Sequence, residues 1–220
     1  MADMREDRLS SLPDAILIEI LSLLPLKAVI ITDVLSRRWR HLWTHLISVR
    51  FQNPFFKSLS DFYPTFNEIM RKLSSPLIQT FILEFGVFHG RSYHQIMIDS
   101  WIRQVCERSV RHLKLTCPQS LGSADYVFEV PSCIFQTTSL VSIDLRSNLA
   151  NNSADPVRLP NLKKLNVYVT PWQCVWLGKL IDVCPLLEDL SFKVTSSSNE
   201  AIVFNCSSPN LKRLSINLRF

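Results

Sequence analysis

The sequence predicts an α/β protein, in which three short N-terminal helices precede a curved solenoid of strand–helix repeats. Three observations support this fold class. Residues 10–43 carry apolar side chains at helical spacings and contain serine and proline boundary signals. Beyond residue 77, an apolar-x-x-apolar-x-apolar pattern recurs along the chain. Segments with helical periodicity lie between these recurrences, so strands and helices should alternate.

The first predicted helix begins after Ser11, which offers a capping oxygen, with Pro13 and Asp14 in its first turn. Pro25 ends this helix. Its apolar side chains lie three and four residues apart, and others occupy the remaining faces, so the helix should be buried nearly all round. The main stripe consists of Ile16, Leu17, Ile20, Leu21 and Leu24, with Ala15, Ile18 and Leu23 outside it.

A second helical piece spans residues 26–35, and Ser36 can cap a third helix. Three such helices total roughly 40 residues, about the size below which a domain seldom folds unaided. The excess of apolar surface therefore predicts an interface with a partner, although packing against the rest of the same chain would also explain it. The core-facing stripe of the third helix is Trp39, Leu42, Trp43 and Leu46.

Three phrases in this region resemble a known motif. They are DRLSSLPD at residues 7–14, ILSLLP at residues 20–25 and VLSRRWRHLW at residues 34–43. Together they are similar to the F-box of plant F-box/leucine-rich-repeat proteins of the FBD type. The resemblance implies a non-catalytic, substrate-recruiting subunit of a Skp–cullin–F-box ubiquitin ligase, which binds a Skp-family adaptor and through it a cullin-RING ligase. The adaptor-binding residues that we predict are Leu12, Pro13, Ile16, Leu17, Ile20, Leu24, Pro25, Val34, Leu35 and Trp39.

The chain divides into three predicted parts. Residues 8–46 form the F-box, residues 47–77 form a linker with a bridging helix, and residues 78–220 form the leucine-rich repeats. The chain ends just past a repeat strand with no capping segment, so we expect further repeats in a longer form.

The register of the repeats is what distinguishes them from chance matches. Steps between the last four starts are 22, 25 and 24 residues, within the roughly 20 to 29 typical of leucine-rich repeats. The two earlier steps, 32 and 30 residues, require insertions. Residues 94–106 and 172–184 have the periodicity of return helices. The pattern starts at Ile78, Val110, Leu140, Leu162, Leu187 and Leu211.

Composition and motifs argue against several function classes. The net charge of +5 is dispersed among acids without a basic run, which argues against nucleic acid as a partner. No apolar run is long enough for a membrane span, and the six cysteines lack metal-ligand spacing. We therefore expect reduced thiols and a protein of the cytoplasm or nucleus. Four glycines form no phosphate or dinucleotide loop, so we expect no enzyme, cofactor or metal.

The strand pattern also predicts a binding face. In each repeat the fourth and sixth positions should point into the core, and the third, fifth and seventh into solvent. From residue 112 onward these solvent positions are all polar and of mixed charge, which favours a protein target over a nucleic-acid backbone. The alternative that stays open is a free-standing repeat scaffold that binds a ligand or nucleic acid without any ligase. The target-binding residues that we predict are Lys114, Arg146, Lys164, Tyr168 and Lys193.

Overall fold

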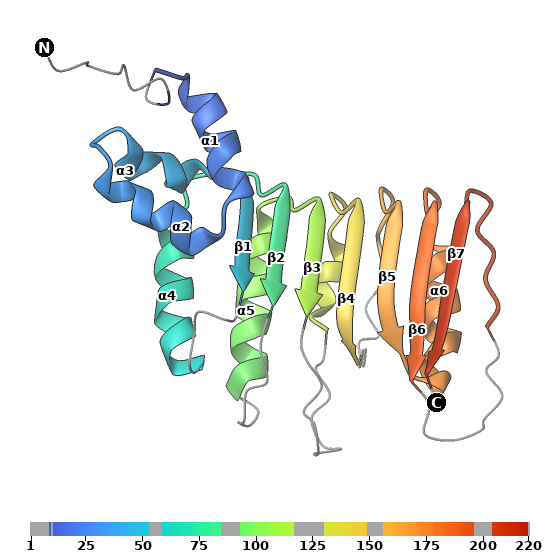
Figure 1. The fold of residues 1–220 in the computed structure, drawn as a ribbon. Coiled ribbons are helices and arrows are strands. Elements are labelled where there is room, and N and C mark those ends of the chain that lie inside the picture. Colours follow the sequence, from blue (N-terminus) through green and yellow to red (C-terminus); the bar gives the residue numbers. More distant parts are fainter. Residues whose placement is uncertain are drawn as a thin grey trace, which may run out of the picture.

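The computed structural model describes residues 9, 11–52, 59–84, 93–116, 130–148, 156–195 and 204–219. A helical module at the N-terminus leads into a sheet of parallel strands with helices along one face (Figure 1). Helices and strands alternate along the chain, as the repeat pattern predicts, so the fold is a mixed helix and strand architecture.

The N-terminal module consists of short helical elements. They are α1 (Asp14–Leu23), α2 (Leu26–Ile31), η1 (Thr32–Val34), α3 (Trp39–Leu42) and η2 (Trp43–His45). The predicted third helix is reduced to one α turn and one 3-10 turn, because the chain becomes extended at Leu46 and enters the sheet at Ser48. Pro13, and not the predicted Ser11, occupies the N-cap position of α1.

The sheet has seven parallel strands in sequence order, each hydrogen-bonded to the next. They are β1 (Ser48–Gln52), β2 (Thr80–Glu84), β3 (His112–Thr116), β4 (Ser142–Asn148), β5 (Lys164–Val169), β6 (Asp189–Thr195) and β7 (Arg213–Arg219). Equivalent repeat positions pair with one another, as Thr80 does with His112. The strand β1 lies in the segment that we predicted as a linker, yet Ser48 pairs with Thr80 in the same way. The sheet therefore starts one strand earlier than the sequence pattern indicated.

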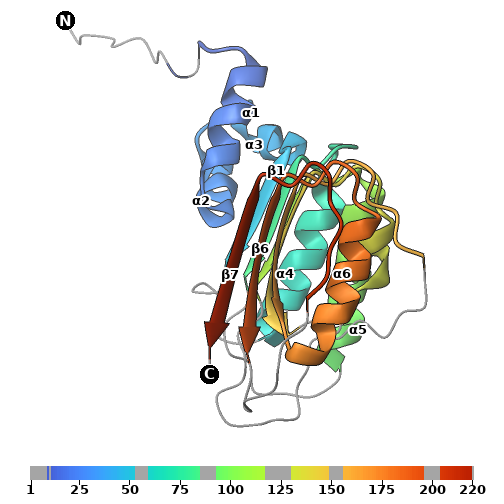
Figure 2. The ribbon, with the colours of Figure 1, turned by 90° about the vertical axis from the view of Figure 1, so that its right-hand side faces the viewer.

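Return segments cover one face of the sheet, and in the view along the array α4, α5 and α6 all lie on the same side of the strands (Figure 2). They are α4 (Leu59–Lys72), α5 (Tyr93–Glu107), η4 (Ser132–Gln136), η5 (Pro171–Gln173) and α6 (Cys174–Asp182). The helices α5 and α6 confirm the two predicted return helices, and α4 confirms the bridging helix. None of the described helices is both long and apolar enough to cross a membrane.

One continuous hydrophobic core runs from the N-terminal module into the repeats. At the first strands, the Phe66 ring of α4 lies 4.4 Å from the Phe51 ring of β1 and 4.1 Å from the Trp101 ring of α5, measured between centroids. Leu17 of α1 and Val49 of β1 are both fully buried in this core. The helical module is therefore packed onto the first strand rather than tethered to it.

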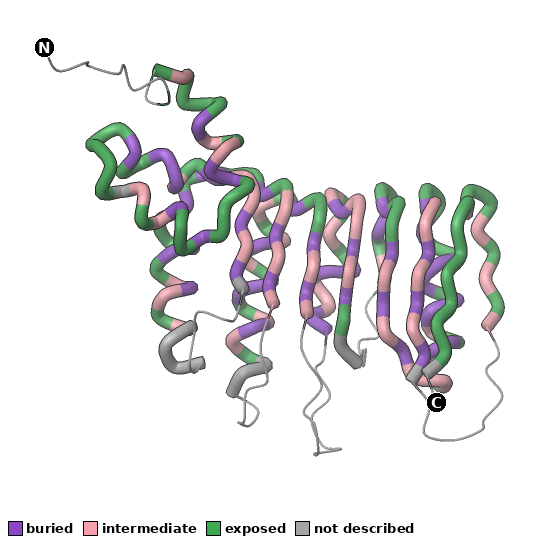
Figure 3. Tube along the Cα trace, viewed as in Figure 1, coloured by how far each residue is buried: buried purple, intermediate pink, exposed green. Residues whose placement is uncertain are grey.

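The last strand is covered on neither face within the described residues. Leu214, Ile216 and Leu218 occupy the core-facing positions of β7, yet each is about half exposed, at 50%, 49% and 48%. The equivalent side chains of β6, among them Leu190 and Phe192, are only 1% exposed. Figure 3 shows the same contrast between the exposed trace of β7 and the alternating trace of its neighbours.

Candidate functional site

An exposed apolar patch lies on the N-terminal module. A soluble protein seldom leaves several large aliphatic side chains exposed close together unless they meet a partner. Leu23 is 72% exposed, Val34 is 81% exposed and Leu35 is 61% exposed, although the module has a buried core of its own. We call this set the helical apolar patch: Ile16, Leu23, Leu24, Ile31, Val34 and Leu35.

Two of the predicted adaptor-binding residues are buried within the chain. Leu17 is 0% exposed and Trp39 is 3% exposed, so both belong to the core of the free chain, and their direct contact with a partner stays a prediction. The reason for the burial of Leu17 is helical geometry: Leu17 and Leu21 lie one turn apart on the inward face of α1, whereas Ile16 points outward. Of the remaining predicted residues, Pro13 and Pro25 are exposed, and Leu12 and Ile20 are half-buried.

Sequence reasoning missed two members of the patch, Leu23 and Ile31. The signal was present, because Leu23 lies outside the main apolar stripe of the first helix. An apolar side chain that is off the buried stripe and still in a short helix has to be exposed or meet a partner.

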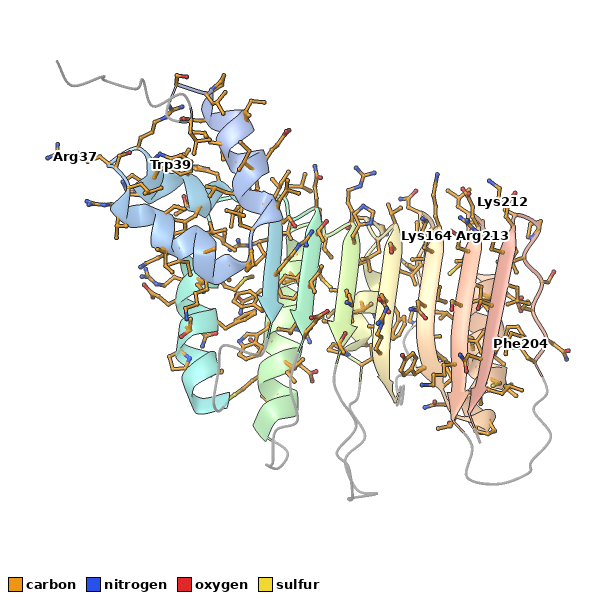
Figure 4. All side chains as sticks on the ribbon, viewed as in Figure 1. Arg37, Trp39, Lys164, Phe204, Lys212 and Arg213 are labelled. Carbon is orange, nitrogen blue, oxygen red and sulfur yellow. The ribbon has the colours of Figure 1, made fainter. Side chains whose placement is uncertain are left out.

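An arginine fixes the start of α1 against α3. The Arg38 guanidinium donates to the Asp14 carboxylate, with Nε 2.8 Å from Oδ1, and its Nη2 lies 2.5 Å from the Leu12 carbonyl oxygen. The Arg38 side chain is 37% exposed and that of Asp14 is 60% exposed, so the pair contributes little to the free energy of folding. Its effect is to position the exposed segment before α1. Arg37, in contrast, points away from the module (Figure 4).

A hollow of about 420 Å³ lies where the N-terminal module meets α4. Its wall is mostly apolar, with Glu68 and Lys72 in an ion pair at 3.0 Å. Hydrogen bonds from Arg71 and then Lys72 lower the pKa of the Glu68 carboxyl to about 2. The lining residues are Ile30, Trp43, Pro64, Thr65, Glu68, Ile69 and Lys72.

The predicted register of the strand face is confirmed except between β4 and β5, where the pairing shifts after Leu145 and Tyr168 lies opposite Asn148 instead of Arg146. In β3, Leu113 and Leu115 are each 2% exposed, while Lys114 between them faces outward. Pairing carries this alternation across the sheet, since Leu113 lies opposite Ile143 and Lys114 opposite Asp144. The polar face opposite the return helices is therefore continuous over β3 to β6, and we call it the strand face.

Charges on the strand face pair with one another within the chain. Lys114 Nζ lies 2.5 Å from Glu84, Arg146 Nε lies 3.1 Å from Asp144, and Lys164 Nζ lies 3.7 Å from Asp189. The carboxylate of Asp189 also accepts hydrogen bonds from Arg213, which lower its pKa (Figure 4). Lys193 Nζ lies 5.0 Å from the centre of the Tyr168 ring, within cation–π range.

These pairs agree with the mixed charge that the sequence suggested. Lys114, Arg146 and Lys164 each have a carboxylate neighbour, so positive and negative groups alternate on the strand face. A surface of alternating charges complements another folded protein surface better than it does a uniformly negative phosphate backbone. Among the described residues, no three His, Cys, Asp or Glu side chains converge as a metal site.

Two family models match the chain. The F-box domain matches residues 9–51, and the leucine-rich repeats of FBD-associated F-box protein At5g56370 match residues 98–219. In Arabidopsis thaliana, F-box/LRR-repeat protein 13 is 34% identical over 94% of this chain and 45% of its own length. F-box/LRR-repeat protein At3g26922 is 32% identical over 96% of this chain and 67% of its own length.

A third relative from the same plant, F-box/FBD/LRR-repeat protein At2g04230, is 35% identical over 97% of this chain and 48% of its own length. The chain thus spans about half the length of most of these relatives. No solved structure matches the chain.

Proposed function

Because this chain belongs to the plant F-box/leucine-rich-repeat family, we propose that it is a substrate-recognition subunit of a Skp–cullin–F-box ubiquitin ligase. Its F-box binds a Skp-family adaptor, and its repeats recruit a protein target for ubiquitination. The subunit itself carries no catalytic step, and it works in the cytoplasm or nucleus.

The observation that carries the adaptor proposal is the helical apolar patch. Val34 and Leu35 are far more exposed than the core residues of the same module; Val34 is the last residue of η1 and Leu35 is its C-cap. Burying large aliphatic side chains of this kind contributes on the order of 1.5 to 3 kcal/mol each, before the costs of association are subtracted. In the complex, α1, α2 and the segment from α3 to η2 serve as the three helices of the F-box.

The adaptor proposal can be tested with matched surface variants. Val34→Asp and Leu35→Asp place charges in the helical apolar patch, and Ile96→Asp places one at a residue of α5 that is 71% exposed. We expect the two patch variants to lose co-purification with a Skp-family adaptor, and the α5 variant to keep it. All three should melt close to the wild type, because each side chain is exposed. Wild-type adaptor recovery by both patch variants would refute the proposal and favour a free-standing repeat scaffold.

We propose that the target docks on the strand face near Arg146, Lys164 and Tyr168, with Lys114 and Lys193 at its margins. Further repeats after β7 would extend this face into a curved solenoid. The mixed charges that support this proposal predict that complementarity, not net charge, selects the target.

Charge reversal tests the target site. Arg146→Glu with Lys164→Glu should leave adaptor binding intact and abolish capture of the proteins that proximity labelling identifies for the wild type. The control is Lys163→Glu with Lys212→Glu. Both lysines pair with Glu188, and all three residues lie just before the first residue of a strand, outside the strand face. If the first variant captured the same proteins as the wild type, the proposal that the target binds the strand face would be refuted.

A further inference from the structure

The strand pairing has a bulge on the strand face between β4 and β5. The regular pairing ends at Leu145, and the next pair joins Asn148 to Tyr168. The strand β4 therefore has two residues, the first of them Arg146, at a step where β5 has none. Such a β-bulge bends the strand locally and re-aims the side chains beside it. The Arg146 side chain, which is 44% exposed, stands at this bulge.

The Arg146 guanidinium is only partly used within the chain. Its Nε lies 3.1 Å from Asp144 Oδ1, and that carboxylate also accepts a hydrogen bond from Asn166 Nδ2 at 2.9 Å. Within the described ranges, Arg146 forms no other side-chain hydrogen bond or ion pair. A guanidinium presents several N–H donors in a planar fork, so the two terminal nitrogens of Arg146 can bind a further carboxylate.

Lys193 is the second cation at this place. Tyr168 of β5 pairs with Lys193 of β6, and Lys193 Nζ lies 5.0 Å from the centre of the Tyr168 ring. Among the residues that the structure describes, no carboxylate forms an ion pair with Lys193. Lys114 and Lys164 differ, because each has a carboxylate neighbour, at 2.5 and 3.7 Å. The ring therefore positions the Lys193 ammonium without neutralising it.

The sheet places the two cations on either side of one aromatic ring. Arg146 belongs to the strand before β5 and Lys193 to the strand after it, so about 10 Å separates their backbones. Both side chains are long, so a carboxylate seated over Tyr168 can accept from both. The charge here has an excess of one positive, since Arg146 and Lys193 stand against Asp144. That excess matches a singly charged carboxylate better than a phosphate, whose larger negative charge Asp144 would repel more strongly.

We propose that the bulge between β4 and β5 anchors an acidic side chain of the target, held between Arg146 and Lys193 over the Tyr168 ring. This inference rests on the proposed function, and it adds the chemistry of the target: a protein segment that carries an exposed aspartate or glutamate. Lys114 and Lys164, whose charges already have partners, line the surface around this anchor and contribute less to the choice of target.

A labelled hexaglutamate peptide and a hexaglutamine peptide, titrated into the full chain, provide the test. Fluorescence anisotropy gives the affinities. We expect only hexaglutamate to bind, with an affinity that falls as sodium chloride is added. Lys193→Gln and Arg146→Gln should each lower this affinity about fivefold, the effect of losing one partly exposed ion pair. The matched control is Lys179→Gln, an exposed lysine of α6 on the opposite face, which should bind as the wild type does.

A double-mutant cycle tests the role of the ring. Tyr168→Leu should weaken hexaglutamate binding in the wild type but have little further effect in Lys193→Gln, because the ring acts by positioning Lys193. Additive losses would contradict this role. Circular dichroism checks that each variant is folded.

Three results would overturn the anchor: wild-type affinity in Lys193→Gln or Arg146→Gln, an equal loss in Lys179→Gln, or tighter binding, lost in Lys193→Gln, when phosphoserine replaces one glutamate. The assay needs neither adaptor nor target. Failure of the anchor and failure of the proposed function are therefore separate results.

Discussion

Leu17→Ala separates burial within the chain from contact with a partner. The Leu17 side chain is 0% exposed and packs in the core that α1 shares with β1. Replacing a fully buried leucine by alanine costs about 2 to 5 kcal/mol, so we expect a loss of about 3 kcal/mol in the free energy of unfolding. For a chain of this size that loss corresponds to a decrease of about 6 to 12 °C in melting temperature.

The matched variant is Leu23→Ala on the same helix. Leu23 is 72% exposed, so its truncation should cost less than about 0.5 kcal/mol of stability. Thermal melts followed by tryptophan fluorescence, and adaptor affinity measured below both melting temperatures, give the comparison. We expect Leu17→Ala to lower the melting temperature and bind adaptor, and Leu23→Ala to melt like the wild type and bind more weakly. A stable Leu17→Ala variant that fails to bind would show that Leu17 faces the adaptor.

Three further predictions concern α6, α4 and the exposed apolar surfaces. In Gly178→Ala, the new Cβ would lie 2.2 Å from the carbonyl oxygen of Asn205, so the segment at Asn205 must shift. We expect a lower melting temperature, which differential scanning fluorimetry measures. The pKa of Glu68 is lowered from its usual value of 4.5 to about 2. Its carboxylate therefore stabilises the folded chain fully above pH 4.5, and this contribution is lost as the pH falls toward about 2. An NMR titration of the Glu68 carboxyl should show this low midpoint, and Arg71→Ala should raise it. The isolated chain should be poorly soluble because β7 and the helical apolar patch are exposed, and Ile216→Thr should increase its monodispersity in light scattering.

The parallel array could be predicted because each strand position has a single acceptable environment. Leu113 and Leu115 need the core and Lys114 needs solvent, so a slip of one residue would reverse all three. For β1, the sequence predicts a short extended piece around Val49 to Phe51, but we did not assign it to the repeat sheet. Leu46, Val49 and Phe51 fit the repeat pattern as well, but Leu46 also completes the helical stripe of Trp39 and Trp43. A residue at the boundary between a helix and a strand can satisfy both the helical and the strand periodicity, so the sequence alone does not show where the helix ends and the strand begins.

Part of the candidate site lay beyond the reach of sequence. Periodicity identified the apolar stripe of α1 but not which of its flanks is inward, because that depends on where β1 and α3 lie. Hence Leu17 was assigned to the partner and Leu23 to neither side. The ion pairs of the strand face were missed for a similar reason: Glu84 and Lys114 are 30 residues apart and become neighbours only when β2 pairs with β3.

The two ends of the described sheet differ in how they are covered. At β1, the N-terminal module and α4 add their apolar side chains to the core, so the orientation of the F-box relative to the first strand is fixed by packing. At β7, the backbone edge and the apolar side chains of Leu214 and Ile216 stay open. A further strand can pair at β7 without disturbing any contact of the F-box, because each repeat contacts only its neighbours. The array can therefore vary in length while the packing of the F-box on β1 stays the same.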